Sequence, residues 1–420
     1  MKLFFKSSLR QVLLLLCCVL LGTLLLFLAY LLPTDRIYNN LARSEEFFAS
    51  GVTYPEIIPG YRDTRLDQFT DCLMLLTAAT STDESIPYQA MNNARYSISG
   101  MDPEETFVAI FKEGSSDRSM NTGYARYWHG YLTVLKPLLT VFSYKQIISL
   151  NLMLQLFLLI ALCSIYAGKG EPRFILPLAG IYVFLNPIAI YLSIQYSSVW
   201  IFTLVFLILL ALLKKPIQPR VLLSFFLLAG AATSYFDLLT YPLVTLGVPL
   251  GYLVLANWSS FRKLFRDGIS CAVSWGLGFG GMWASKWLVA SLFTGKNVLN
   301  NALHSAEVRS SMTNEGGKGI RYGDVLLRLR YTYNGTVLKL LLIVAITVAL
   351  VFLIKKNKPD PIKLSGLFLV CLLPFVWFAV LSNHTFVHFW FTYRTLSISL
   401  YCILGALTAV WVQRQNNQSQ

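Results

Sequence analysis

The chain has 420 residues, of which 55% are hydrophobic and only 13% are charged. Soluble globular domains carry about 25% charged residues, so this composition excludes an ordinary soluble protein. The net charge of +14 would suit nucleic acid only if the basic residues shared one folded face, and here they are dispersed among short loops. No nucleic-acid partner is therefore expected.

Apolar segments of roughly 17–25 residues recur along the chain, which is the length that one helix needs to cross a bilayer. They predict an all-α integral membrane protein with about ten transmembrane helices. The fourth and fifth segments are short, which leaves eight or twelve spans open as alternatives. The ten segments are 12–32, 146–167, 174–192, 198–213, 221–237, 241–258, 269–293, 337–354, 364–381 and 396–412.

Basic residues predict how these spans are oriented. If the N-terminus is cytoplasmic, the loops on the same side hold many more Lys and Arg than Asp and Glu, as the positive-inside rule requires. An even number of spans then returns the C-terminus to the cytoplasm. Only Cys72 of the seven cysteines lies outside the predicted spans, so no disulfide is expected. We expect a multi-pass plasma-membrane protein with both termini cytoplasmic, and the compact loops favour a bacterial one.

Three segments are predicted on the extracytoplasmic side, namely 33–145, 294–336 and 382–395. The first is long, and its Gly and Pro residues divide it into short pieces, which predicts interfacial helices rather than a compact domain. A chain that only spans lipid does not need so large a polar insert, so we expect recognition or chemistry there. The second is rich in glycine between 316 and 319, which fits either a plain connection or a mobile lid.

Within the first outer segment, 65–76 has the pattern of an amphipathic helix, with Leu and Phe at three- and four-residue spacing on one face. Asp67 and Asp71 are four residues apart and are therefore neighbours on the opposite face. We expect the apolar stripe to lie on lipid or on the bundle, and the acids to face an aqueous cavity. One carboxyl of such a pair would have a raised pKa and could accept a proton from a hydroxyl. A solvated polar face is the alternative, and Arg65 beside the acids is a candidate phosphate ligand.

A second cluster, 124–131, precedes the second predicted span and is rich in aromatic residues. Such residues commonly anchor a helix at the membrane interface. Arg126 and His129 are three residues apart and could instead bind a phosphate and a sugar ring. Anchoring and binding both remain open.

A third cluster, 383–394, contains His384, His388 and Arg394. Two His four residues apart could hold a divalent metal, but no further ligand is evident, so a metal is possible and no cofactor is assigned. Arg394 offers a planar fork that suits phosphate, and the two His could bind the same headgroup. Interfacial packing is again the alternative.

A cytoplasmic N-terminus, one span, a long first outer loop with acidic residues and then many spans resemble the GT-C superfamily of membrane glycosyltransferases. The resemblance implies that a sugar passes from a polyprenyl-phosphate-linked donor to a glycan, lipid or protein acceptor on the extracytoplasmic face. It also implies that an acid of the first outer loop is the general base, and the matching residues are Asp67 and Asp71, in that order of preference or as a pair. Because no tight Asp-x-Asp or Asp-Glu doublet occurs at this position, the acting residue stays open.

Two other classes share this surface chemistry. A transporter or flippase for a lipid-linked sugar would need ionisable residues near the bilayer midplane and often two related halves. Here Asp237 and Lys286 lie near the outer ends of predicted spans, where side chains can reach the interface. An assembly subunit that handles a lipid-linked glycan without transfer chemistry is the third class.

Overall fold

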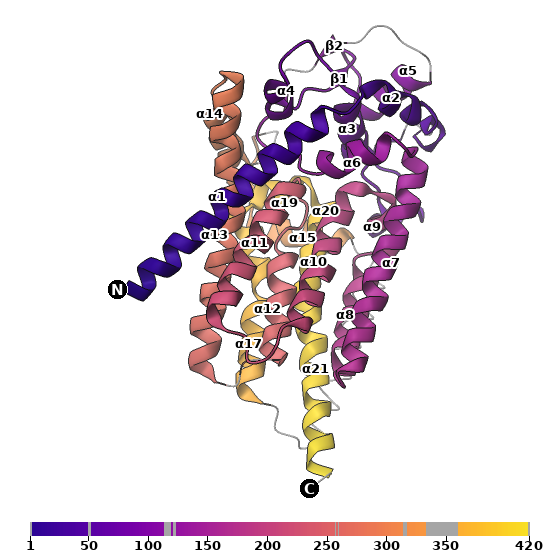
Figure 1. Cartoon of the computed structure of the whole chain (residues 1–420). Helices are drawn as coiled ribbons and strands as arrows, with labels where there is room; N and C mark the ends of the chain where they lie inside the picture. The colour runs from indigo at the N-terminus through magenta and orange to yellow at the C-terminus, as the bar shows by residue number, and fades with distance from the viewer. Residues whose placement is uncertain are drawn as a thin grey trace.

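The structure is a computed structural model that describes residues 2–48, 52–112, 119–120, 123–256, 258, 260–313, 317–332 and 360–418. The described part of the chain is mostly helical, which confirms the all-α part of the predicted class. Long helices stand side by side as a bundle, and shorter elements of the first outer segment form a cap over one end (Figure 1).

The elements fall into three groups. The cap contains α2 (Thr34–Ala42), α3 (Gln68–Ala79), α4 (Ile86–Asn92), β1 (Tyr96–Ser97), α5 (Pro103–Phe111), β2 (Ser119–Met120) and α6 (Leu132–Leu139), with β1 and β2 paired antiparallel. The bundle contains α1 (Lys2–Tyr30), α7 (Tyr144–Gly168), α8 (Ile175–Phe184), α9 (Pro187–Leu192), α10 (Ile194–Leu212), α11 (Pro219–Phe236), α12 (Val244–Ala256), α13 (Phe261–Thr294), α17 (Pro361–Cys371), α18 (Leu373–Val380) and α21 (Ser397–Gln418). The other outer segments contain α14 (Val298–Ser310), α15 (Tyr322–Thr332), α19 (Ser382–Val387) and α20 (Phe389–Thr392). Short 3₁₀ turns lie at Glu45–Phe47, Arg62–Thr64, Pro172–Phe174 and Tyr393–Leu396.

Five helical segments among the described residues are long and apolar enough to cross a membrane. They are Leu9–Tyr30 of α1, then α7, α10 and α11, and the consecutive pair α17 and α18. In α1 and α7 only 22% of the apolar window is buried within the protein. Helices that are apolar all round and yet exposed fit a lipid solvent rather than water. The chain is thus compatible with a multi-pass membrane protein.

Other predicted spans differ from the expectation. The run 174–192 is interrupted at Asn186, which has a φ of 61°, so α8 and α9 are each too short to cross. The run 241–258 yields an α12 of 13 residues, whereas 269–293 lies within an α13 of 34 residues. The run 337–354 lies outside the described residues. The number of spans therefore stays a prediction.

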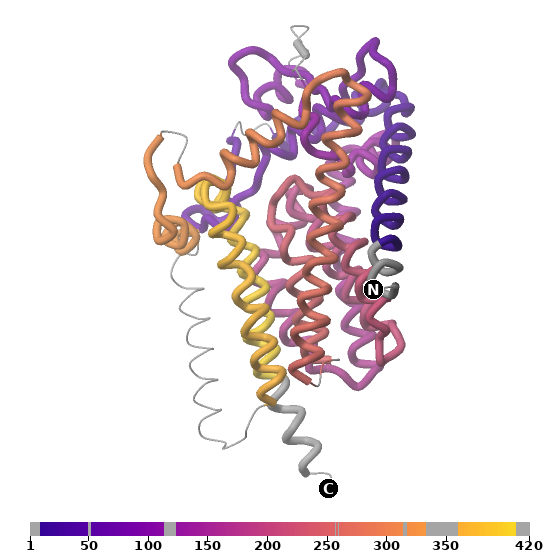
Figure 2. The backbone as a smooth tube through the Cα atoms, turned by 90° about the vertical axis from the view of Figure 1, so that its left-hand side faces the viewer, coloured from indigo at the N-terminus to yellow at the C-terminus, as the bar shows by residue number. Residues whose placement is uncertain are grey.

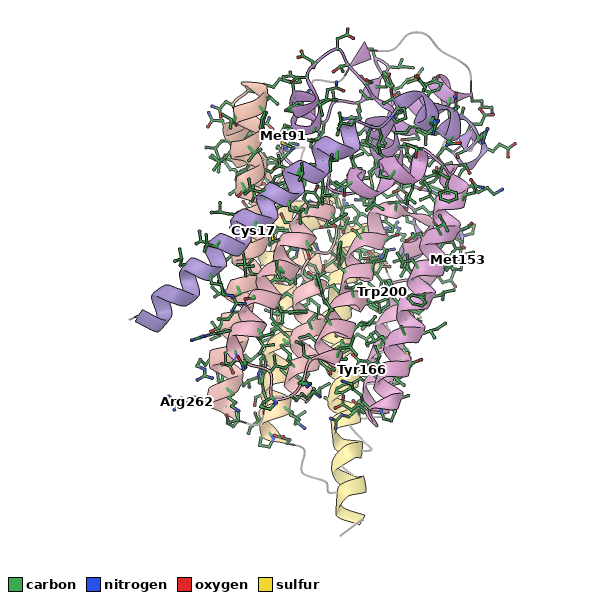
Figure 3. The ribbon with its side chains drawn as sticks, viewed as in Figure 1. Cys17, Met91, Met153, Tyr166, Trp200 and Arg262 are labelled. Carbon is green, nitrogen blue, oxygen red and sulfur yellow. The ribbon has the colours of Figure 1, made fainter. Side chains whose placement is uncertain are left out.

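The basic loops and the cap occupy opposite ends of the bundle. Lys215 Nζ lies 3.1 Å from Glu171 Oε1, which brings two of the predicted cytoplasmic loops together. Arg262 lies at this same end, whereas Met91 lies in the cap (Figure 3). If the basic end is cytoplasmic, as the positive-inside rule predicts, the cap is extracytoplasmic.

The first outer segment is more compact than expected. Its buried core includes the ring of Phe48, which lies 4.9 Å from that of Phe107 and 5.3 Å from that of Tyr144, centroid to centroid. Ten of the twelve residues of α3 are buried, so the prediction of an interfacial amphipathic helix is wrong. The reason is that α2, α5 and α6 pack around α3, and its polar side meets protein instead of water.

Two lysines hold helices of the cap, Lys136 from within the cap and Lys286 from the bundle. Lys136 Nζ donates to the carbonyl oxygen of Ala78 at 2.8 Å, in the last turn of α3. Lys286 of α13 donates to the carbonyl oxygen of Met91 and to Asn93 Oδ1, both at 3.0 Å, at the end of α4. A cation at a helix C-terminus is favoured by the helix dipole. Lys286, noted above as an ionisable residue near a span, therefore has a structural role.

The second outer segment contains helices rather than only a glycine-rich loop. In Figure 2 the chain leaves the top of α13, continues through α14 and reaches α15 at the edge of the molecule. Asn383 Nδ2 donates to the carbonyl oxygen of Thr313 at 2.5 Å, which joins this segment to the third outer segment.

Helices α11 and α13 approach each other closely because glycines face the partner backbone. A Cβ atom on Gly230 would lie 2.1 Å from the carbonyl oxygen of Trp275. One on Gly278 would lie 2.0 Å from that of Leu227. Small residues allow such contact in membranes, where van der Waals packing, rather than the hydrophobic effect, associates helices.

Replacing Gly230 by alanine should therefore lower the free energy of unfolding by about 1–3 kcal/mol, because α11 and α13 must separate. Gly276→Ala on α13 is the matched control, since no heavy atom lies within 4 Å of its added Cβ. Alanine should even favour that helix by about 0.5–1 kcal/mol. Thermal unfolding of both variants in one detergent measures the difference, and equal midpoints would contradict the close contact.

Candidate functional site

The first turn of α3 carries both predicted acids. Asp67 is its N-cap residue, and Asp67 Oδ1 accepts a hydrogen bond from the backbone N–H of Thr70 at 2.9 Å. Aspartate is favoured there because its carboxylate satisfies an N–H group that has no partner within the helix. The backbone N–H of Asp67 donates to Ser193 Oγ at 3.1 Å, so the start of α3 is joined to the start of α10.

Asp71 lies one turn later and is bound to α10. Its Oδ2 accepts from the hydroxyl of Tyr144 at 2.9 Å and from the backbone N–H of Ile194 at 3.2 Å. Its Oδ1 accepts from the backbone N–H of Gln195 at 3.0 Å. Ser193 is the N-cap residue of α10 but makes no side-chain capping bond. Asp71 therefore caps α10 from another helix, at the positive end of its dipole.

Both carboxyl groups are only 2% exposed. Burial raises the pKa of Asp67 to about 6, against the hydrogen bonds from Thr70. Burial also raises the pKa of Asp71 to about 7, against the N–H of Gln195 and with a further rise from the charge of Asp67. A solvated aspartate has a pKa of about 3.9, so this pair can both hold and release a proton near neutral pH.

The surroundings of the two acids differ. Asp71 already receives three hydrogen bonds from the protein. Asp67 lies close enough to the indole of Trp390 for that group to lower its pKa, and close enough to Glu104 for that charge to raise it. Tyr54 also lies near Asp67. Burial raises the pKa of the Tyr54 hydroxyl, and the charge of Asp67 raises it further. The carboxyl of Asp71 is thus held by α10, whereas that of Asp67, the first choice from the resemblance, lies among Thr70, Trp390 and Glu104.

A few buried polar atoms near Asp67 have no hydrogen-bond partner. In the part of the chain that the structure describes, they include Arg65 Nε, Gln68 Oε1 and Glu104 Oε2. Folded proteins pair the great majority of such atoms, so these three can accept a ligand or water as their partner.

Arg65 is the predicted phosphate ligand that the fold brings beside this group. Its Nη2 lies 3.2 Å from Glu56 Oε1, and its guanidinium lies 6.0 Å from the ring of Trp390. The ion pair leaves both side chains partly exposed, at 23% and 22%, so a ligand can reach them.

His384 and His388 lie at the end of α19, beside Trp390. His384 Nε2 lies 2.9 Å from the carbonyl oxygen of Leu239. The two imidazole centroids are 4.9 Å apart, and that of His388 lies 5.4 Å from the ring of Trp390. Burial lowers the pKa of both, that of His388 to about 4, and the charge of Arg309 adds to the effect. Both rings are therefore neutral at physiological pH.

Arg394 is fully buried, with 0% exposure. Its Nε donates to the carbonyl oxygen of Leu185 and its Nη1 to that of Trp390, both at 3.1 Å. Its guanidinium lies 4.1 Å from the ring centroid of Tyr196. Because Leu185 directly precedes the interruption between α8 and α9, Arg394 positions that interruption and α20, which carries Trp390. The predicted direct contact with phosphate is corrected to this positioning role.

The second predicted cluster lies against α13 and α14. Arg126 Nη1 donates to Asn301 Oδ1 at 2.7 Å, and its guanidinium lies 4.8 Å from the ring of Tyr124. His129 Nε2 donates to the carbonyl oxygen of Tyr124, and its Nδ1 accepts from the hydroxyl of Tyr131, both at 2.8 Å. Burial lowers the pKa of His129 to about 3. Both its nitrogens are bonded within the protein, so His129 stabilises the turn before α6, and the geometry does not support its predicted ligand role.

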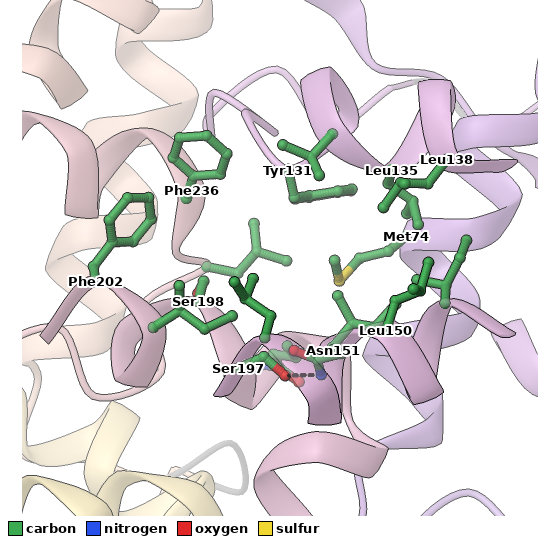
Figure 4. A pocket seen from close by; sticks show the side chains of 17 residues that line it. Met74, Tyr131, Leu135, Leu138, Leu150, Asn151, Ser197, Ser198, Phe202 and Phe236 are labelled. Atoms are coloured by element: carbon green, nitrogen blue, oxygen red, sulfur yellow. Dashed lines mark hydrogen bonds between the residues drawn. The ribbon is translucent and has the colours of Figure 1, made fainter. Parts of the chain in front are cut away.

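An apolar groove of about 440 Å³ opens beside Asp71 (Figure 4). Ile194 and Gln195, whose N–H groups bind that acid, form part of its wall. The rest of the wall comes from α3, α6, α7, α10 and the end of α11. Leu150 and Leu154 of α7 are 37% and 45% exposed, so the groove opens sideways, where lipid would lie.

The few polar groups of this groove are gathered near the start of α10. Asn151 Nδ2 donates to Ser197 Oγ at 2.6 Å, as the dashed line in Figure 4 shows. Within the described structure, Gln195 Oε1 is buried without a hydrogen-bond partner. The groove thus has a long apolar part and one polar end. It is complementary to an amphiphilic ligand, which has an apolar tail and a polar head.

The described residues contain no group of three or more His, Cys, Asp or Glu that could hold a metal ion. His384 and His388 supply two ligands at most. The divalent metal that the sequence allowed therefore has no set of three such ligands in this part of the chain.

Sequence reasoning did not single out Glu104, Trp390 or Gln195. Glu104 lies within the capping box formed by Asp102 and Glu105 at the start of α5, a pattern that ordinarily explains acids by helix capping alone. Trp390 fits an interfacial aromatic belt equally well. Only the fold shows that these residues meet the acids of α3.

The capping role of Asp71 predicts that Asp71→Ala lowers the free energy of unfolding by about 1–3 kcal/mol, because buried donors lose their acceptor. Asp83→Ala changes an exposed acid and should stay within about 0.5 kcal/mol of the wild type. Thermal unfolding in detergent compares them.

In the wild type, the pKa of Asp71 in the folded protein, about 7, exceeds its value of about 3.9 in the unfolded chain. This residue should therefore cost stability as the pH rises from 4 to 7, a slope that Asp71→Asn should reduce.

The chain matches no family model, no curated protein and no solved structure.

Proposed function

We propose that the chain is a membrane glycosyltransferase of the GT-C type. It moves a sugar from a polyprenyl-phosphate-linked donor to a glycan, lipid or protein acceptor on the extracytoplasmic face of a bacterial plasma membrane. The observation that carries the proposal is an apolar groove, open sideways, whose wall includes the two residues that bind the buried acid Asp71. A long apolar tail with a polar head is the ligand that fits both parts.

The donor lies with its isoprenoid tail between α7 and α10. Its sugar extends toward Asp67, near which Arg65, Gln68 and Glu104 each have a buried polar atom without a hydrogen-bond partner in the described structure. Arg65 is the cation that offsets charge on the phosphate, because it lies beside the same tryptophan. Asp71 keeps the first turn of α3 against α10 and so fixes the base relative to the groove.

The reaction is a displacement at the anomeric carbon. The Asp67 carboxylate accepts the proton of the acceptor hydroxyl while that oxygen forms a bond to the anomeric carbon. The bond between this carbon and the phosphate oxygen breaks, and its electron pair leaves with polyprenyl phosphate. General bases of this kind contribute about 10²–10⁴ in rate, and a nearby cation stabilises the leaving group.

A transporter or flippase is favoured less by the geometry. Such a protein needs ionisable groups that serve the substrate near the membrane midplane. Lys286 instead binds Met91 and Asn93 of the cap, and Asp237 accepts from the backbone N–H of Thr240. An assembly subunit without transfer chemistry would not need an acid with a raised pKa beside the groove.

Asp67→Asn should lower sugar transfer by about 10²–10⁴, since the amide cannot accept the proton. Transfer of labelled sugar from polyprenyl-phosphate donors measures this, with Asp83→Asn as an exposed control.

Because the base must be ionised, kcat/KM of the wild type should rise with pH and level off above the Asp67 pKa of about 6. A solvated aspartate would place that rise near pH 4. Full activity of Asp67→Asn would remove the proposed base, and donor flipping without any transfer would favour the transporter.

Leu150→Trp should obstruct the groove and raise KM for long-chain donors roughly tenfold, a loss of about 1.4 kcal/mol of tail binding. Met153→Trp is the matched control on the same helix, because Met153 is 64% exposed and lies on the outer side of α7 (Figure 3). A donor analogue with a very short tail should be used equally well by both variants. If the two tryptophans affect long-chain donors alike, the tail does not lie in the groove.

A further inference from the structure

The imidazoles of His384 and His388 have an unusual combination of burial and unused hydrogen-bonding capacity. Nδ1 of each ring is buried, and neither makes a hydrogen bond in the described structure. His384 is 3% exposed, whereas His388 and Trp390 are partly exposed, so the pair lies just below an accessible surface. Buried polar atoms are rarely left unpaired, and two on neighbouring rings, whose centroids are 4.9 Å apart, indicate a place for a ligand.

The contacts of His384 define what that partner can be. A carbonyl oxygen only accepts, so His384 Nε2 carries the proton that it donates to Leu239. In a neutral imidazole the other nitrogen is then an acceptor, so His384 Nδ1 needs a donor. His388 Nδ1 has no such constraint and can carry a proton. A hydroxyl group satisfies both atoms at once, because it donates to one nitrogen and accepts from the other.

Other small ligands fit less well. A phosphate oxygen only accepts, and the bare nitrogen of His384 would repel it. Arg309, the cation whose charge reaches both rings, donates to the hydroxyl of Tyr127. A metal would require more ligands than the two rings offer, and the described residues provide no cluster of three.

The position of the pair relates it to the proposed reaction. The ring of His388 is 5.4 Å from that of Trp390, and Trp390 is the indole beside Asp67. The histidine pair and Asp67 therefore both lie beside Trp390. We infer that His384 and His388 form a recognition site for a hydroxyl of the donor sugar. This inference rests on the proposed transferase function and specifies how its donor is selected.

Deoxy donors test the inference. The probes are the polyprenyl-phosphate hexose that the wild type uses and its 2-, 3-, 4- and 6-deoxy derivatives. His384→Gln keeps a donor for Leu239 but removes the acceptor at Nδ1, and His388→Phe preserves ring packing while removing the nitrogens. His304→Gln, on an exposed side chain of α14 (76% exposed), is the matched control.

In the wild type and in His304→Gln, one deoxy donor should be used roughly 10–200-fold less efficiently than the parent hexose, as measured by kcat/KM. In His384→Gln and His388→Phe the parent should lose about as much, so that parent and deoxy donor become nearly equal. His388→Phe carries the test if His384→Gln does not fold.

Each result has a defined meaning. A variant that loses activity but keeps the wild-type ratio for every deoxy donor would overturn hydroxyl recognition and leave sugar transfer intact. Equal use of all donors by the wild type would do the same. No transfer by the wild type from any lipid-linked hexose would remove the proposed function, and the inference would fall with it.

Discussion

The hydrogen bonds between the Asp71 carboxyl and the first N–H groups of α10 join the cap to the membrane helices. They determine where α3 begins relative to α10, and therefore where Asp67, one turn earlier, is held. The same two residues of α10 form part of the wall of the apolar groove. One carboxylate thus relates the candidate base to the candidate lipid site. The hydroxyl of Tyr144, at the start of α7, also donates to the Asp71 carboxylate, so α7 is the third helix joined at this point.

A second junction is made by buried groups of the third outer segment. Arg394 holds the carbonyl oxygen before the interruption of α8 and α9, and His384 holds that of Leu239, a non-glycine residue with a φ of 69°. Backbone in that region is costly and persists only where its surroundings determine it. Between these two contacts lies Trp390, the indole that faces Asp67. Segments far apart in sequence are therefore fixed around one acid.

The helical class, the separation of basic loops from a polar insert, and the position of both acids at a helix start could be predicted from composition, charge and spacing. Periodicity could not reveal that α3 is buried, since the elements that cover its polar face come from other parts of the chain. For the same reason the sequence could not separate Asp67 from Asp71. Their spacing is that of a pair, but their different tasks depend on Ile194 and Gln195, more than 120 residues away. His129 and Arg394 are chemically suited to bind a ligand. In the fold both are buried, and each donates a hydrogen bond to a backbone carbonyl oxygen of the protein instead.

Because the groove opens sideways at Leu150 and Leu154, the relevant ligand concentration is the concentration within the membrane. A ligand that enters there never leaves the bilayer, so its encounter rate follows its mole fraction in one leaflet rather than its amount per volume of solution. Diluting the membrane with inert lipid would slow such a step even at constant total ligand, whereas adding buffer would not.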